Sequence, residues 1–145
     1  MNPNSPARHR LLAVDDEPHV LSALRRSLRQ HFGDTLEVET FDDPLAALAR
    51  SRECEFDIVI SDLRMPETDG IVFLTLMAAV QPRSVRMMLT GSADFESAQR
   101  AVNDAQVFRY LCKPWSEREL VAHVQAALLQ AELRAAAEPQ LLPGD

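Results

Sequence analysis

The sequence predicts a doubly wound α/β domain, in which a five-stranded parallel sheet carries helices on both faces. Short apolar runs of strand length alternate five times with segments of helical periodicity along the 145 residues. The central run, residues 56–62, is almost continuously apolar before it ends in an aspartate, as expected for a parallel strand buried on both faces. The connections are short, so right-handed crossovers would join successive strands.

Each of the five strands is predicted from an apolar or β-branched run. The second strand differs from the others because polar and apolar residues alternate along it, which indicates an edge strand with one face exposed to water. The strands are expected at residues 10–14, 35–41, 56–62, 85–89 and 107–112.

Start signals place the helices between these strands. Pro18 suits the first turn of the first helix, and Asp43 followed by Pro44 is typical of an N-cap and first helical position. Ser116 and Glu119 form a capping box before the last helix. The helices are expected from residue 18, from residue 44, and at 69–79, 94–104 and 116–137.

Helical periodicity also predicts the buried faces. The inward residues should be Leu45, Leu48 and Ala49 in the second helix and Phe73, Leu76, Met77 and Val80 in the third. The helix at 94–104 has a narrow apolar stripe, which indicates the element that is easiest to shift. The last helix is longer than one sheet layer requires, and Leu129 and Leu133 lie off its core stripe. That end is either the start of a coiled-coil linker or dimer contact, or simply an amphipathic helix end.

Composition limits the class of protein. The chain is 46% hydrophobic with a formal charge of −7, which indicates one globular domain and argues against nucleic-acid binding by this segment. Cys54 and Cys112 do not indicate a disulfide framework or a zinc site. No stretch resembles a signal sequence or a membrane span, so no membrane contact and a cytoplasmic location are expected. We expect a flexible segment at 1–8, the domain at 9–133, and a helix end and linker at 134–145.

Carboxylates follow two of the apolar strands directly. The flavodoxin-like strand order 2-1-3-4-5 places the wet second strand at an edge and the first and third strands side by side. Asp15 and Asp16 would then lie beside Asp62. Thr90 and Lys113, which end the fourth and fifth strands, would fall on the same rim.

Such a rim has a specific chemistry. Clustered carboxylates are tolerated when a cation lies among them or a lysine pairs with them. Oxygen ligands suit Mg²⁺, which commonly shares a phosphate. A carboxylate such as Asp62 beside a bound phosphate can attack phosphorus and form an acyl phosphate, while Lys113 and Thr90 contact the phosphate oxygens. Taken alone, Asp62 could also be an ordinary solvated loop residue.

At these positions the sequence resembles a bacterial response-regulator receiver domain of the CheY-like kind, over about residues 9–133. The matching features are Asp15-Asp16 after a strand, Asp62 before Met65-Pro66 and Asp69-Gly70, Thr90-Gly91-Ser92 after the fourth strand, and Tyr110 three residues before Lys113-Pro114.

The resemblance implies a two-component signalling role. Asp62 would accept a phosphoryl group from a histidine kinase or a histidine phosphotransfer protein. Asp16, Asp62 and the backbone carbonyl of Arg64 would ligate Mg²⁺, with Asp15 acting partly through water. Lys113 would contact the phosphoryl group, and the peptide bond after it is typically cis in the family.

The resemblance also implies a switch rather than an enzyme with a small-molecule substrate. Thr90 would move toward the phosphoryl oxygen and Tyr110 would turn inward. The surface of the helix at 94–104, the fifth strand and the last helix would change and control a downstream output or form a homodimer. Arg64 and Ser92 would tune slow autodephosphorylation, and Arg64 could either shield the phosphoryl group or grip the leaving oxygen.

Two other classes of protein fit less well. An aspartyl-phosphate phosphohydrolase would need a second aspartate about two residues after the nucleophile as acid and base, and Arg64 stands there. A flavin-binding domain would need a phosphate loop rich in Ser, Thr or Gly after the first strand. Residues 15–17 are acidic instead.

Overall fold

Five parallel strands form the sheet in the order β2-β1-β3-β4-β5, which confirms the predicted topology. The structure is a computed structural model that describes residues 9–66, 68–91 and 105–137. Its strands are β1 (His9–Val14), β2 (Leu36–Phe41), β3 (Ile58–Asp62), β4 (Val85–Gly91) and β5 (Val107–Lys113). As predicted, β2 lies at an edge and β1 pairs with β3.

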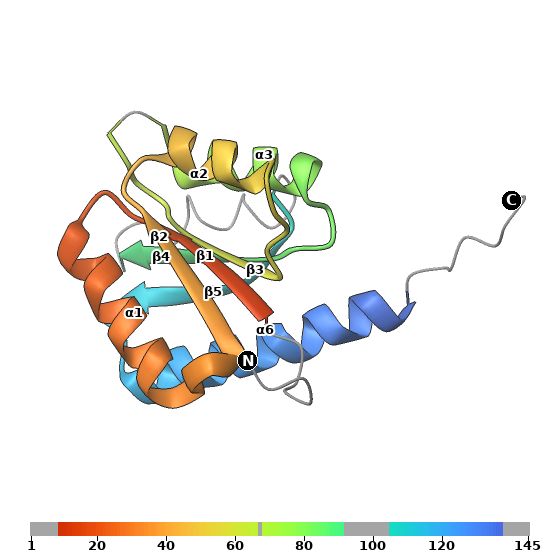
Figure 1. Cartoon of the computed structure of the whole chain (residues 1–145). Helices are drawn as coiled ribbons and strands as arrows, with labels where there is room; N and C mark the ends of the chain where they lie inside the picture. The colour runs from red at the N-terminus through yellow and green to blue at the C-terminus, as the bar shows by residue number, and fades with distance from the viewer. Residues whose placement is uncertain (1–8, 67, 92–104, 138–145) are drawn as a thin grey trace, which may run out of the picture.

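The described helices form one layer on each side of the sheet. They are α1 (Pro18–Phe32), α2 (Pro44–Ser51), α3 (Gly70–Val80) and α6 (Glu117–Ala137), and a short 3₁₀ helix, η1 (Gly33–Thr35), follows α1. Figure 1 shows α1 and α6 against one face and α2 and α3 against the other. The helix predicted at 94–104 lies outside the described residues. Within the described ranges, no helix has the length and apolarity to cross a bilayer.

The predicted helix starts are confirmed, with one difference. Pro18 and Pro44 begin their helices, and the Asp43 carboxylate accepts the Leu45 N–H at 3.0 Å. The Ser116 hydroxyl accepts the Glu119 N–H at 3.1 Å. The Glu119 carboxylate, however, accepts from the Ser116 hydroxyl at 3.3 Å, where the capping box predicted a bond to the backbone N–H.

Alternate residues of the central strands pack into two separate hydrophobic cores, one on each face of the sheet. Ile58 and Ile60 of β3 pack on the side of α1 and α6, whereas Val59 packs on the side of α2 and α3. Every residue of β3 is buried, as the continuous apolar run predicted. The centre of the sheet is therefore covered on both faces. Polar side chains lie instead at the carboxyl ends of the strands, which form the rim of the sheet.

The predicted inward faces of α2 and α3 are wrong in part. Leu45 is 67% exposed and Ala49 is also exposed, while Ala47 and Leu48 are buried. In α3, Leu76 is 46% exposed and Val80 is 40% exposed, and Leu74 takes the inward place beside Phe73 and Met77. Because α3 is apolar around most of its circumference, periodicity cannot decide which side docks.

A buried arginine in β4 was not predicted from the sequence. Arg86 is 1% exposed, and its guanidinium donates to the carbonyl oxygens of Ala105 and Ser84, each at 2.8 Å, and to the Ser84 hydroxyl at 2.9 Å. Burial lowers the pKa of the Arg86 guanidinium, and repulsion from Arg134 lowers it further. Arg86 thereby ties the start of β5 to the start of β4.

We expect Arg86→Met to lower the free energy of unfolding by about 1–3 kcal/mol, because buried carbonyl acceptors lose their donor while the side-chain volume is largely kept. Urea unfolding measures this. The control is Arg83→Met, since Arg83 is about half exposed and pairs with Glu55 at 3.1 Å, a kind of pair worth about 0–1 kcal/mol. Equal unfolding midpoints for the two variants would contradict the prediction.

Candidate functional site

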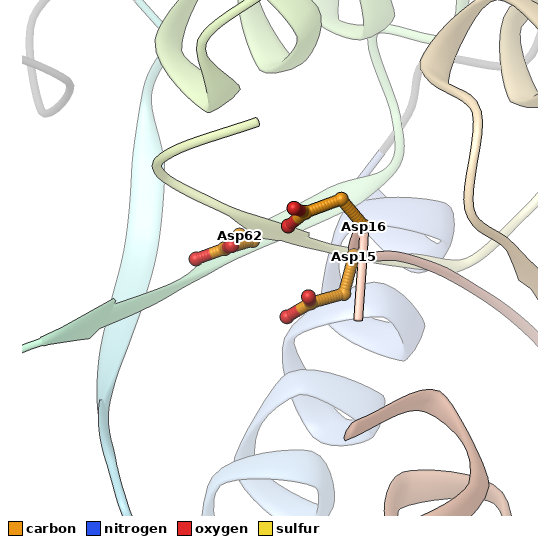
Figure 2. A group of neighbouring side chains, drawn as sticks. All are labelled: Asp15, Asp16 and Asp62. Carbon is orange, nitrogen blue, oxygen red and sulfur yellow. The ribbon is translucent and has the colours of Figure 1, made fainter. Parts of the chain in front are cut away.

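Three carboxylates converge where β1 and β3 end. Val14 pairs with Ser61 in the sheet, so the next residues along each chain, Asp15 and Asp62, emerge side by side. Figure 2 shows that these two side chains and that of Asp16 point to the same side of the strand ends. Each can offer one oxygen so that all three oxygens lie within 4.8 Å of one another. The predicted acidic rim is therefore present.

The lysine that ends β5 reaches this cluster. Lys113 Nζ lies 2.8 Å from Asp15 Oδ2, 3.3 Å from Asp62 Oδ1 and 3.8 Å from Glu17 Oε1. Three carboxylates thus share one ammonium group. The peptide bond between Lys113 and Pro114 is cis.

Burial and mutual repulsion shift the protonation of the cluster. Burial raises the pKa of the Asp62 carboxyl to about 6, repulsion from Asp15 adds to this, and Lys113 opposes it. Burial would lower the pKa of the Lys113 ammonium, but its interactions with Asp15 and Asp62 outweigh that effect and raise this pKa. The carboxylates of Asp15, Asp16 and Asp62 therefore carry more negative charge than the single ammonium group of Lys113 neutralises.

The acidic cluster has the donor set for a hard divalent cation. Asp15 is fully buried, and its Oδ1 accepts the Glu17 N–H at 2.9 Å. Its Oδ2 makes an ion pair but no hydrogen bond of regular geometry, so a buried oxygen has acceptor capacity to spare. Oxygen ligands of this kind suit Mg²⁺. Asp15, Asp16 and Asp62 therefore fit the ion that the sequence predicted.

The loop after β3 is held close to the site. Arg64 forms an isolated antiparallel bridge with Asp69, and the Gly70 N–H donates to the Leu63 carbonyl at 2.6 Å. The Arg64 side chain is exposed. This folding-back holds the backbone of Arg64 close to the end of β3, where the resemblance implied a carbonyl ligand.

Gly70 has a structural role that the turn signal did not reveal. A Cβ atom at Gly70 would overlap the carbonyl oxygen of Asp62 and would lie 2.9 Å from the Asp62 carbonyl carbon and 3.0 Å from Leu63 Cα. The first turn of α3 thus packs directly against the backbone of the candidate nucleophile. Only a glycine allows this approach.

The remaining predicted residues lie on β4 and β5, except for one. Thr90 is fully buried near the end of β4, opposite Cys112 in the sheet, and its Oγ1 lies 3.9 Å from Cys112 Sγ. Tyr110 is half-buried, packs on the side of α2 and α3, and burial raises the pKa of its hydroxyl. Ser92 lies outside the described residues. The proximity of Cys112 to Thr90 was not predicted, although the alignment of the two strand ends could have indicated it.

The family model of the response regulator receiver domain matches residues 11–125. The chain belongs to the response-regulator receiver family. It is thus a receiver domain of two-component response regulators, a signalling domain rather than a classical enzyme. Receiver domains generally bind Mg²⁺ and interact with histidine kinases.

Known relatives and structures agree with this family. The chain is 34% identical to the hydrogenase transcriptional regulatory protein HoxA of Cupriavidus necator over 118 residues, which are 81% of this chain and 24% of HoxA. It is 34% identical to the transcriptional regulatory protein FixJ of Bradyrhizobium diazoefficiens, covering 88% of this chain and 60% of FixJ. The signal receiver domain of an HD domain-containing protein from Pseudomonas fluorescens Pf-5 superposes with a TM-score of 0.85 at 27% identity, covering 95% and 100% of the two chains. This receiver thus spans about a quarter of HoxA.

The raised pKa of Asp62 predicts a pH-dependent stability for the metal-free receiver. The folded-state pKa, about 6, exceeds the ordinary value of 3.8, so the folded state holds this proton more tightly than the unfolded state does. The contribution of this proton to the free energy of unfolding is fully present below about pH 4. It is lost as the pH rises through about 6, which lowers the free energy of unfolding by about 2–3 kcal/mol.

Urea unfolding in EDTA tests this sign. Asp62→Asn cannot ionise, so its advantage in unfolding free energy over the native receiver should grow between about pH 4.5 and about pH 7.5. A difference that stays constant with pH would contradict the prediction. Added Mg²⁺ should reduce the difference at neutral pH, because an ion that binds only the folded state stabilises it.

Proposed function

We propose that this receiver is a cytoplasmic phosphorylation-dependent switch whose phosphoacceptor is Asp62. A histidine kinase or a histidine phosphotransfer protein would supply the phosphoryl group. The observation that carries the proposal is the convergence of the Asp15, Asp16 and Asp62 carboxylates, of which Asp15 and Asp62 contact the ammonium group of Lys113. One phosphorus atom could therefore be reached by the nucleophile Asp62 and by the ammonium group of Lys113. The acid pair Asp15 and Asp16 would hold the metal ion beside it.

In the proposed transfer, an ionised Asp62 oxygen attacks the phosphorus of the phosphohistidine. The new bond is the O–P bond of an acyl phosphate, the P–N bond breaks, and the leaving imidazole retains the electron pair and takes a proton from water. Lys113 can turn its ammonium from Asp62 to the incoming phosphoryl oxygens, and Thr90 can donate its hydroxyl to another.

Asp16, Asp62 and the Arg64 carbonyl would hold Mg²⁺, with Asp15 acting partly through water. When bound, this ion neutralises charge on the phosphoryl oxygens. The fit rests on the spare acceptor capacity of Asp15 Oδ2 and on the three oxygens within 4.8 Å. Asp62 must be ionised to attack, so its raised pKa makes a nearby cation part of its activation.

The proposed output begins at Thr90 and Tyr110. Thr90 would move to the phosphoryl group and vacate space beside β5, into which Tyr110 would turn. The surface formed by residues 94–104, β5 and α6 would change and control a downstream output or form a homodimer. Arg64 and Ser92 would set the rate of autodephosphorylation. Residues 9–133 would act as the switching unit, with 1–8 and 134–145 flanking it.

Acetyl phosphate and intact-mass spectrometry test this function. Incubation with the donor and Mg²⁺ should add one phosphoryl mass to each chain, and EDTA should prevent the addition. A receiver known to accept phosphate from this donor serves as the positive control. If the control receiver is phosphorylated and this chain is not, the proposal that Asp62 accepts a phosphoryl group is wrong.

A further inference from the structure

The helix α6 has two apolar faces. One face is buried against the sheet and α1 and includes Leu120, Val124, Ala127 and Ala131. The opposite face, which we call the outer seam, consists of Ala122, Ala126, Leu129, Leu133 and Ala136. Leu129 is 57% exposed and Leu133 is 54% exposed. Ala122 and Ala136 are exposed and Ala126 is half-buried.

The outer seam has the spacing of a coiled coil. Its members follow one another at intervals of four, three, four and three residues, which is the a/d repeat of two heptads with Leu129 at a d position and Leu133 at an a position. A surface helix of a globular domain needs only one apolar stripe, and its opposite face is normally polar. The seam therefore has no role in the fold of the domain itself.

Polar contacts fix the rotation of α6 so that the seam faces outward. Gln125 lies 3.4 Å from His31 of α1, and Glu132 pairs with His9 of β1 at 3.7 Å. Near the end of the helix, Arg134 donates to the Ser84 carbonyl at 2.6 Å. Figure 1 shows α6 continuing beyond the edge of the sheet. The outer seam is thus exposed to solvent on a helix that is already folded.

We propose that the outer seam pairs with the same seam of a second copy of this chain, as a short parallel two-stranded coiled coil. Parallel pairing places Leu129 against Leu129 and Leu133 against Leu133, so both leucine layers are buried together. In a parallel pair, a g residue faces the e residue of the next heptad of the partner. Gln125 would therefore face Gln130, and Glu132 would face Ala137, so neither of these two pairs brings like charges together.

This pairing differs from the phosphorylation-dependent dimer of the proposed function. The seam is exposed without any change at Asp62, so the association should persist in Asp62→Asn. Because the seam is apolar and each chain carries a formal charge of −7, salt should strengthen it by screening repulsion between the copies. An association through charged side chains of β5 and α6, such as Arg109 and Glu117, should weaken with salt instead.

Sedimentation velocity tests the proposal on the full chain carrying Asp62→Asn. Two heptads with three alanine layers give weak association, so the monomer–dimer shift is expected between about 10 µM and about 1 mM. Leu129→Glu with Leu133→Glu should remain monomeric throughout. The matched control is Leu45→Glu with Leu76→Glu on the other side of the sheet, where the leucines are 67% and 46% exposed, and it should still dimerise. A monomeric parent chain, or a seam variant that dimerises normally, would overturn the proposal.

Cysteine cross-linking tests the register without relying on the folding of the charged variants. In a chain with Cys54→Ser and Cys112→Ser, Leu133→Cys should form disulfide-linked dimers at least about tenfold faster than Glu53→Cys, an exposed position in the turn after α2, because seam pairing raises the local thiol concentration. Leu129→Cys should behave like Leu133→Cys in a parallel pair, whereas an antiparallel pair centred on Leu129 would cross-link only at Leu129. Equal rates at Leu133 and Glu53 would refute the parallel seam.

Discussion

Asp62→Asn is expected to abolish phosphoryl transfer from acetyl phosphate to this receiver. The amide has nearly the shape of the carboxylate, so the packing at the end of β3 is preserved while the anionic nucleophile is lost. The variant should be at least as stable as the native chain at neutral pH, since burial and Asp15 already disfavour the charged form of Asp62. Loss of labelling would then result from the missing Asp62 nucleophile and not from unfolding of the variant.

Asp57→Asn provides the matched control for this variant. Asp57 lies just before β3, at the end of the strand away from the rim, and its carboxylate accepts the Arg10 N–H at 2.9 Å. An asparagine can keep that bond through its amide oxygen, so labelling should be unchanged. Labelling that persists in Asp62→Asn would instead assign the phosphoryl group to another residue, and peptide mapping would show whether it is Asp15 or Asp16.

The acidic rim could be predicted because its signals are local in the sequence. Each site residue directly follows an apolar strand, and parallel strands end at one edge of the sheet. The alternation in β2 indicated an edge position, which agrees with the flavodoxin-like order that brings β1 beside β3. Given that strand order, the carboxyl ends of β1, β3 and β5 lie at one edge of the sheet, which placed Asp15, Asp62 and Lys113 together.

The features that escaped prediction depend on contacts between distant segments. In the sequence, Arg86 looks like one polar residue of an ordinary apolar strand, because one of its acceptors, the carbonyl of Ala105, lies nineteen residues away and has no sequence signature. The docked face of α3 was predicted correctly at Phe73 and Met77 but wrongly at Leu76 and Val80, because these two residues are as apolar as Leu74, which is buried instead. The close approach of Gly70 to the backbone of Asp62 and Leu63 also escaped prediction, because a glycine after an aspartate signals only a turn.

Gly70→Ala is expected to lower the free energy of unfolding by about 2–4 kcal/mol, although alanine favours helix over glycine by about 1 kcal/mol at an interior helical position. The added methyl group meets the backbone of Asp62 and Leu63, which belongs to the centre of the sheet and cannot move aside as a flexible side chain would. Relief requires α3 to shift away from β3 or the end of β3 to move. Either movement displaces the Asp62 carboxylate from Lys113, so phosphorylation by acetyl phosphate should slow by at least about tenfold.

Gly33→Ala separates this clash from the general effect of replacing a glycine. Gly33 has a φ of 58°, and a methyl group added there would meet no atom within 4 Å, so alanine adds only backbone strain of about 1–3 kcal/mol. Its distance from the rim should leave the rate of phosphorylation unchanged. Urea unfolding and the rate of mass gain, measured for both variants, therefore give different patterns: Gly33→Ala loses stability alone, and Gly70→Ala loses stability and rate together. If Gly70→Ala is phosphorylated at the native rate, the packing of α3 against β3 does not position the nucleophile.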